Sequence, residues 1–241
     1  MKFWAGMDGC RDGWILAVLS EVRIIHLEFS SHFKFAIDKQ PLNELILVDI
    51  PIGLPSAEHP VSRDCDALAR KLLTGRASTV FSVPCREAIR AKSPEGAKKL
   101  NLKVLSKSLS LQSLGIRGKI KEVDEILRLA PSLQQRIRET HPELCFRLLN
   151  KGVVLTTRKK DRAGQNERQE LISRFVDNSE KEIDAFLESH PRSQGCRDDL
   201  LDACVAAIVA RLVLEGKARS IPSAAQRDAC GITMEIVGEI A

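Results

Sequence analysis

Residues 3–20 have the sequence FWAGMDGCRDGWILAVLS, in which two apolar runs flank a short glycine-containing turn. The runs at 3–7 and 14–19 predict two β-strands, and the glycines at 9 and 13 predict the turn that joins them. Asp8 stands where the first strand ends, which makes it a candidate site residue. The alternative is an ordinary turn role, because Asp-Gly is itself a hairpin signal.

The pattern of an apolar strand that ends in an acid occurs again. Residues 22–29 predict a third strand, which completes an antiparallel meander, and residues 45–50 (LILVDI) predict a fourth strand that carries Asp49 near its end. A strand-terminal Asp can also bond nearby backbone amides. Two strands that each end in Asp nevertheless suggest a shared site.

A third acidic set opens the apolar segment 198–208, DDLLDACVAAI, which predicts a helix. Asp199 and Asp202 are three residues apart and can share one helical face. Asp198 is interpreted as a helix cap, a position where Asp is favoured. Carboxylates that meet repel one another unless a cation neutralises them, and hard divalent cations prefer oxygen ligands. The acids together therefore predict a Mg²⁺ or Mn²⁺ site.

The remaining pattern indicates one domain over residues 1–241. Helices are expected near 62–73, 87–91, 95–105 and 119–129, which makes an insertion of about 60–132 after the fourth strand. A fifth strand is expected at 136–140, with Glu143 soon after it. Residues 221–241 are interpreted as a loop followed by a short strand or tail.

Composition narrows the class of protein. The chain has 241 residues with 44% hydrophobic content, enough for a substantial core. Its seven cysteines show neither a disulfide framework nor a zinc motif, so a reducing, cytoplasmic location is expected. The first ten residues lack the pattern of a signal peptide, and no segment is expected to span a membrane. The sequence gives no indication of the oligomeric state.

The net charge of +5 is unevenly distributed. Residues 86–121 hold ten basic and two acidic residues, and residues 147–162 hold six basic residues against Asp161. Such segments suit a polyanion, so nucleic acid is the expected partner, with DNA and RNA left open. The alternative is solvated helix faces. The arginines expected to clamp phosphates, or else to neutralise nearby acids, are Arg11, Arg63, Arg76 and Arg86.

Several motifs taken together resemble a known family. They are MDGCRDGW at 7–14, VDIPIGL at 48–54, RDCD at 63–66, STVF at 78–81, HPE at 141–143 and DDLLDA at 198–203. This set resembles the predicted nucleases with a ribonuclease H-like fold catalogued as domain of unknown function 429, which are distantly similar to RuvC-type Holliday-junction resolvases. The chain departs from the family's usual pattern at Asp12, where Gly is common, and at Ala77, where Ser is common.

The resemblance implies an α/β fold with a five-stranded mixed sheet flanked by helices and a helical insertion after the fourth strand. It matches Asp8 to the first-strand acid, Asp49 to the fourth-strand acid, and the pair Asp199 and Asp202 to the closing helix. It also places Glu143 near the site, as a metal ligand or a base.

The function expected from these residues is metal-dependent hydrolysis of phosphodiester bonds. Asp8, Asp49 and either Asp199 or Asp202 would hold two divalent cations that orient a water and stabilise the leaving oxygen. Asp8 would bridge the cations. His141 is a candidate proton shuttle, with a structural hydrogen bond as its alternative role.

Two other classes of function stay open. A nucleotide-hydrolysing or phosphotransfer enzyme could use the related actin-like core, although the length and the single hairpin count against it. A non-catalytic nucleic-acid-binding protein is the other alternative. Aromatic residues make up only 4% of the chain and Tyr is absent, so stacking platforms for single strands are few.

Overall fold

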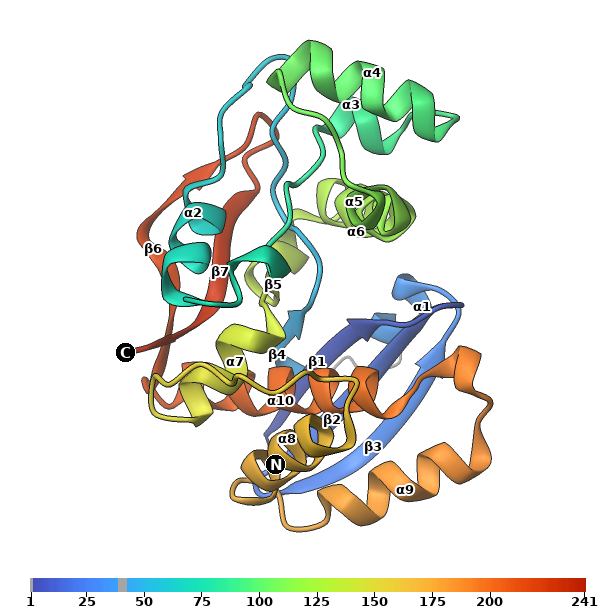
Figure 1. Ribbon diagram of the computed structural model, residues 1–241, viewed down its shortest axis with the longest axis vertical. Coiled ribbons are helices and arrows are strands. Elements are labelled where there is room, and N and C mark those ends of the chain that lie inside the picture. Colours follow the sequence, from blue (N-terminus) through green and yellow to red (C-terminus); the bar gives the residue numbers. More distant parts are fainter. Residues whose placement is uncertain (1, 39–42) are drawn as a thin grey trace. The chain divides into compact units, whose positions relative to one another are not determined.

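The computed structural model describes residues 2–38 and 43–241 (Figure 1). The chain forms two compact units, and each is built from segments that are distant in sequence. The first unit comprises Met1–Ile50, Gln135–Arg219 and Val237–Ala241, and the second comprises Pro51–Gln134 and Ser220–Ile236.

The first unit contains a mixed five-stranded sheet with the order β3-β2-β1-β4-β5. β1 pairs antiparallel with β2, and β2 with β3, as the predicted meander requires. β1 pairs parallel with β4, and β4 with β5. The strands are β1 (Phe3–Gly9), β2 (Trp14–Ser20), β3 (Arg23–Ser30), β4 (Asn43–Val48) and β5 (Ile137–Glu139). The predicted α/β class and mixed five-stranded sheet are confirmed, and the arrangement is consistent with a ribonuclease H-like fold.

Helices cover both faces of β2, which explains why nearly every residue of this strand is apolar. Ile15, Ala17 and Leu19 belong to the core formed with α10 (Arg197–Leu214). On the opposite face, the Trp14 ring meets Phe33 of α1 (Phe33–Asp38) edge-on, with ring centroids 5.1 Å apart. Successive side chains of a strand point to opposite faces, so a two-sided core needs a continuous apolar run.

α10 is the central helix of the first unit. It packs against β1, β2 and β4 (Figure 1), and most of its residues are buried. α7 (Pro142–Leu149), α8 (Arg162–Ser173) and α9 (Ser179–Ser189) pack around it, and the short 3₁₀ helix η3 (Arg192–Gln194) precedes it.

The second unit is mainly helical and follows β4, as the predicted insertion requires. Its helices are α2 (Asp64–Leu72), η1 (Ala77–Thr79), α3 (Arg86–Ile89), α4 (Pro94–Leu105), α5 (Leu111–Gly115) and α6 (Arg117–Leu129). The 3₁₀ helix η2 (Pro131–Gln135) leads out of it toward β5.

Most of a two-stranded sheet, β6 (Ala218–Arg227) and β7 (Thr233–Ile240), completes the second unit. The prediction of a loop with one short strand at 221–241 was therefore wrong. β6 carries Pro222 and several small or polar residues, so it lacks the β-branched alternation by which strands are recognised.

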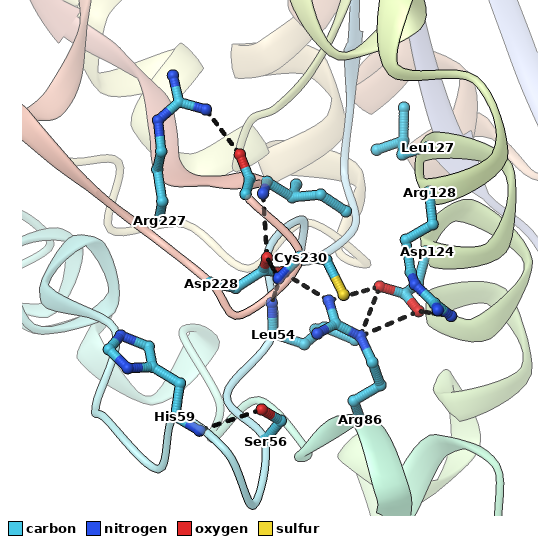
Figure 2. Close-up of polar contacts among 12 residues, drawn as sticks. Leu54, Ser56, His59, Arg86, Asp124, Leu127, Arg128, Arg227, Asp228 and Cys230 are labelled. Carbon is cyan, nitrogen blue, oxygen red and sulfur yellow. Dashed lines mark hydrogen bonds and ion pairs between the residues drawn. The ribbon is translucent and has the colours of Figure 1, made fainter.

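A buried polar network joins the segments of the second unit, as Figure 2 shows. The Arg86 guanidinium donates from Nη2 to Asp124 Oδ1 at 2.8 Å and to Asp228 Oδ2 at 2.5 Å. The Asp228 carboxylate also accepts from the Leu54 backbone N–H at 3.0 Å. One ion-pair network thus holds four segments together, namely α3, α6, the loop that follows β4, and the turn between β6 and β7. Breaking a buried ion-pair network is costly in folding free energy.

Candidate carboxylate site

The carboxyl ends of the parallel strands β1, β4 and β5 meet at one edge of the sheet. Met7 pairs with Val48, and the Asp49 N–H donates to the Met7 carbonyl at 2.9 Å, so Asp8 and Asp49 leave adjacent strands at neighbouring positions. Thr140, just after β5, donates its N–H to the Val48 carbonyl at 2.9 Å. In open α/β sheets, the carboxyl ends of parallel strands are where ligands usually bind.

Gly6 explains how α10 reaches this edge. A Cβ atom on Gly6 would lie 2.1 Å from the Ala203 carbonyl oxygen and 2.4 Å from the Ala207 nitrogen. Only glycine therefore allows β1 and α10 to approach this closely. Asp8 is two residues along β1 and points to the same face, and Asp202 is adjacent to Ala203 on the helix.

The carboxyl groups of Asp8, Asp49 and Asp202 act on one another. Burial raises the pKa of Asp8 well above its usual value, and the charges of Asp49 and Asp202 raise it further. Burial also raises the pKa of Asp49, and that of Asp202 to about 7. Asp8 is 6% exposed and Asp202 2%. The structure thus places these three predicted residues close enough for their charges to interact, with Asp8 and Asp202 buried and Asp49 half-buried.

Lys159 supplies positive charge to the cluster of these three carboxyl groups. It lies in the loop between α7 and α8, and its Nζ donates to Asp202 Oδ2 at 2.8 Å. Asp202 raises the pKa of the Lys159 ammonium, and the lysine in turn opposes the rise in the pKa of Asp8 and Asp49. Nothing local in the sequence indicates this ion pair, because Lys159 lies in the basic segment 147–162, which was expected to meet a polyanion.

Glu143 lies close enough for its charge to raise the pKa of Asp49 and Asp202, but it has a cation of its own. Arg168 of α8 donates from Nη2 to Glu143 Oε1 at 2.7 Å, and its guanidinium lies 5.2 Å from the centroid of the Phe146 ring. Arg168 is fully buried. Arg168 was not predicted as a site residue, since its contact with Glu143 joins two different helices, α8 and α7. His141, the residue before α7, lowers the pKa of Asp49.

Asp199 has a local role at the start of α10. The helix begins at Arg197, and the Cys196 N–H donates to Asp199 Oδ2 at 2.9 Å, as in a capping box. The interpretation of Asp198 as the cap residue was wrong, because Cys196 takes that position. Asp199 still lies close enough for its charge to raise the pKa of Asp8.

Cys196, Asp198 and Asp199 have possible ligand atoms that all lie within 4.8 Å of one another. The Cys196 thiol contacts Asp198 Oδ1 at 2.6 Å and Asp199 Oδ2 at 3.0 Å. Burial and these carboxylates raise the pKa of the thiol, and a metal requires the thiolate. We therefore interpret the contacts between Cys196 and Asp199 as a helix cap and not as a metal site.

The predicted phosphate-binding arginines lie in both units. Arg11 is exposed in the turn after β1 of the first unit. In the second unit, Arg86 forms the ion pairs described above, and Arg63 Nη1 lies 3.5 Å from Asp66 Oδ1. Arg76 is half-buried and precedes η1.

Fold and site together define an α/β protein with a buried carboxylate cluster at the carboxyl edge of a mixed sheet. The sequence profile of the family described as "Protein of unknown function (DUF429)" matches residues 6–227. The chain belongs to this family. No curated protein and no solved structure matched the chain. None of the helices formed by residues 2–38 and 43–241 has the length and apolar character needed to cross a bilayer.

Proposed function

We propose that the protein is a divalent-metal-dependent nuclease that hydrolyses phosphodiester bonds of DNA or RNA. The observation that carries this proposal is the convergence of Asp8, Asp49 and Asp202 from β1, the end of β4 and α10. Carboxyl groups whose pKa is raised by burial, and for Asp8 and Asp202 also by the charge of Asp49, are more typical of a functional site than of a solvated surface.

The charge balance of the cluster supports a divalent cation as its ligand. With all three carboxylates ionised and Lys159 protonated, the cluster holds −3 and +1, which leaves −2. Burial makes this excess charge costly, and a hard divalent cation with oxygen ligands would neutralise it. The donor set thus fits Mg²⁺ or Mn²⁺.

Asp8, Asp49 and Asp202 would hold the cation, and Asp199 would contribute its charge from the first turn of α10. A bound cation would acidify a coordinated water and neutralise charge on a phosphodiester. Lys159 could donate to a phosphate oxygen beside the carboxylates, because its ammonium is already held at the cluster. Glu143, held by Arg168, would have an auxiliary role: its negative charge raises the pKa of Asp49.

Further support comes from the family resemblance and from the basic segment. The strand order and the closing helix α10 favour a ribonuclease H-like nuclease distantly similar to RuvC-type resolvases. Residues 147–162, which are rich in Lys and Arg, belong to the same unit as the acids and suit a nucleic-acid backbone. We also propose a cytoplasmic location, because all seven cysteines are free thiols.

The decisive experiment is a cleavage assay with purified protein. Labelled single-stranded, duplex and branched DNA and RNA would be incubated with Mg²⁺ or Mn²⁺ and, separately, with a chelator. We expect metal-dependent cleavage by the wild type that Asp8→Asn or Asp202→Asn lowers by at least about 100-fold, as expected when a metal ligand is lost.

Asp12→Asn is the matched control, because Asp12 is exposed in the turn after β1 and is not part of the cluster. It should retain wild-type cleavage. Cleavage that survives Asp8→Asn would indicate a contaminating nuclease. The absence of cleavage on every substrate, in protein that still binds Mn²⁺, would contradict the nuclease assignment.

A further inference from the structure

The second unit contains a cavity of about 220 Å³ that is distinct from the carboxylate cluster. Half of its lining is apolar, and the other half consists of hydroxyl and charged residues. The polar lining residues are Ser62, Arg63, Asp66, Arg70, Ser82 and Lys107.

One face of α2 forms a wall of this cavity. Position 63 is three and four residues from 66 and 67, and position 70 is four and three residues from them, so the four lining positions share a helical face. Lys107, just beyond the end of α4, and Ser82 line the cavity from other segments. Cationic side chains from α2 and from the segment after α4 therefore border the same space.

The cations differ in how their charge is balanced. Arg63 is buried and forms an ion pair with Asp66 across 3.5 Å. Arg70 donates from Nε to the Val80 carbonyl at 2.9 Å and from Nη2 to the Phe81 carbonyl at 3.2 Å. Both of these acceptors are neutral, so the bonds fix the position of the Arg70 guanidinium without cancelling its charge.

Lys107 also meets a neutral acceptor, since its Nζ lies 3.4 Å from Ser62 Oγ. Its backbone is fixed by Asn101, whose Nδ2 donates to the Lys107 carbonyl at 2.8 Å while its Oδ1 accepts from the Cys85 N–H at 2.8 Å. Ser113 Oγ donates to the Ser82 carbonyl at 2.9 Å. Buried polar residues therefore hold the lining in place, which lowers the entropy cost of binding a ligand.

We propose that this cavity binds a compact phosphate monoester. Because Arg63 and Asp66 neutralise each other, the charged residues that line the cavity have a net charge of +2, from Arg70 and Lys107. A phosphate monoester carries about −1.5 to −2 at neutral pH, whereas a diester or a carboxylate carries −1. The volume is below the roughly 300–1,000 Å³ of cavities for drug-sized ligands, which favours a phosphate with a small attached group.

The test is a ³¹P NMR titration of methyl phosphate, a monoester, and of dimethyl phosphate, the matching diester. A chelator is present throughout, so that metal at the carboxylate cluster does not contribute. Arg70→Gln and Lys107→Gln are the test variants. Lys71→Gln on α2 and Lys103→Gln on α4 remove the same charge from exposed residues outside the lining and serve as controls.

We expect saturable binding of methyl phosphate that each test variant weakens by about 10- to 100-fold, the effect of losing one charged hydrogen bond. The controls should stay within about twofold of the wild type, and dimethyl phosphate should bind about tenfold more weakly than methyl phosphate. Lys107 is exposed, so Lys107→Gln keeps the test valid if Arg70→Gln impairs folding.

Three results would overturn the proposal. They are the absence of saturable binding at about 10 mM methyl phosphate, equal loss in the test and control variants, or equal affinity for the diester. The proposal does not depend on nuclease activity. Binding that persists in Asp8→Asn would show that the cavity and the carboxylate cluster act separately.

Discussion

At the candidate site, Lys159 forms an ion pair with Asp202 and Arg168 forms one with Glu143. The two basic side chains differ in burial, because that of Lys159 is 40% exposed and that of Arg168 only 1%. A partly exposed lysine can leave its partner at modest cost, whereas a buried arginine cannot. We therefore expect Lys159 to move when a cation enters and Arg168 to remain in place.

The first prediction concerns Lys159→Gln. Removal of the ammonium leaves the carboxylates without their internal cation, so Mn²⁺ should bind more tightly, by about five- to tenfold after allowance for solvent screening. Isothermal titration calorimetry would measure the change. Lys160→Gln removes an exposed charge from the neighbouring position and should leave the affinity unchanged. Equal or weaker Mn²⁺ binding in Lys159→Gln would show that the lysine does not compete with the metal.

The second prediction concerns pH in the metal-free protein. The pKa of Asp202 is raised to about 7, so the folded chain holds this proton more tightly than the unfolded chain, where the value is about 3.9. Unfolding then releases a proton, and the free energy of unfolding falls as the pH rises from about 4 to about 7. The full effect for three pKa units is up to about 4 kcal/mol.

Urea unfolding with a chelator, at about pH 4 and about pH 8, would measure this loss. Asp202→Asn should show a smaller loss than the wild type, and Asp12→Asn should show the same loss as the wild type. An equal loss in Asp202→Asn would mean that other groups set the pH dependence.

Sequence reasoning predicted the acids better than the bases. Asp8 and Asp49 stand at the ends of apolar strands and Asp202 lies near the start of an apolar helix, so the local pattern pointed to these acids, with Asp199 as the alternative to Asp202. Lys159 lies in the basic segment 147–162, which was expected to meet a polyanion, and Arg168 lies in a largely polar helix, so neither was expected to pair with an acid of the site. Their contacts with Asp202 and Glu143 span 43 and 25 residues of sequence, which no local pattern reports.

At the level of elements, the packing of α10 on β1 sets the geometry of the cluster. Gly6 lets the two backbones approach, and Ala203, Ala206 and Ala207 present a small-residue face to the strand. The distance between Asp8 and Asp202 therefore depends on residues that carry no chemistry themselves.

The third prediction tests this packing with Gly6→Ala. The new Cβ would meet backbone atoms of α10 at 2.1 and 2.4 Å, which side-chain movement cannot relieve. The free energy of unfolding should fall by about 3 kcal/mol or more, and Mn²⁺ affinity should fall because Asp202 moves away from Asp8. Chemical denaturation and calorimetry would measure the two effects.

Gly118→Ala is the matched control for this substitution. Gly118 lies in α6, and nothing is within 4 Å of the Cβ that alanine would add there. The control should be neutral or more stable by up to about 1 kcal/mol, because alanine favours a helix. A stable Gly6→Ala protein with wild-type Mn²⁺ affinity would contradict the role assigned to the close approach.

Elements with a strong periodic pattern were predicted well. The strands expected at 3–7, 14–19 and 22–29 correspond to β1, β2 and β3, and the helices expected at 95–105 and 119–129 correspond to α4 and α6. β6 was missed because its residues gain their strand structure from pairing with β7 and not from their own propensity. Tertiary context of this kind overrides local preference in sheets.

At the scale of the whole molecule, both units depend on the same C-terminal hairpin. Asp228 in the turn between β6 and β7 pairs with Arg86 in the second unit. Val237 of β7 belongs to the first unit, where its carbonyl accepts from the Thr140 hydroxyl at 2.6 Å, and Glu239 pairs with Arg147 at 3.2 Å.

The fourth prediction follows from this shared hairpin. A chain that ends at Arg219 loses Asp228 and Val237, so we expect it to show no cooperative unfolding transition in either unit. Circular dichroism during urea titration would test this. A chain that ends at Glu239 keeps both contacts and should unfold cooperatively. Cooperative unfolding of the shorter chain at the wild-type midpoint would show that the hairpin is dispensable.

Each unit is built from segments that are distant in sequence, and this affects folding during translation. A ribosome releases the chain from its N-terminus at about 5–20 residues per second, and domains commonly fold as soon as they emerge. Here, neither unit has all its segments until residues 220–240 have been synthesised. The apolar strands β1 and β2 are therefore synthesised long before α10, the helix that buries them, and stay exposed during most of translation. We expect nascent chains of this protein to bind ribosome-associated chaperones.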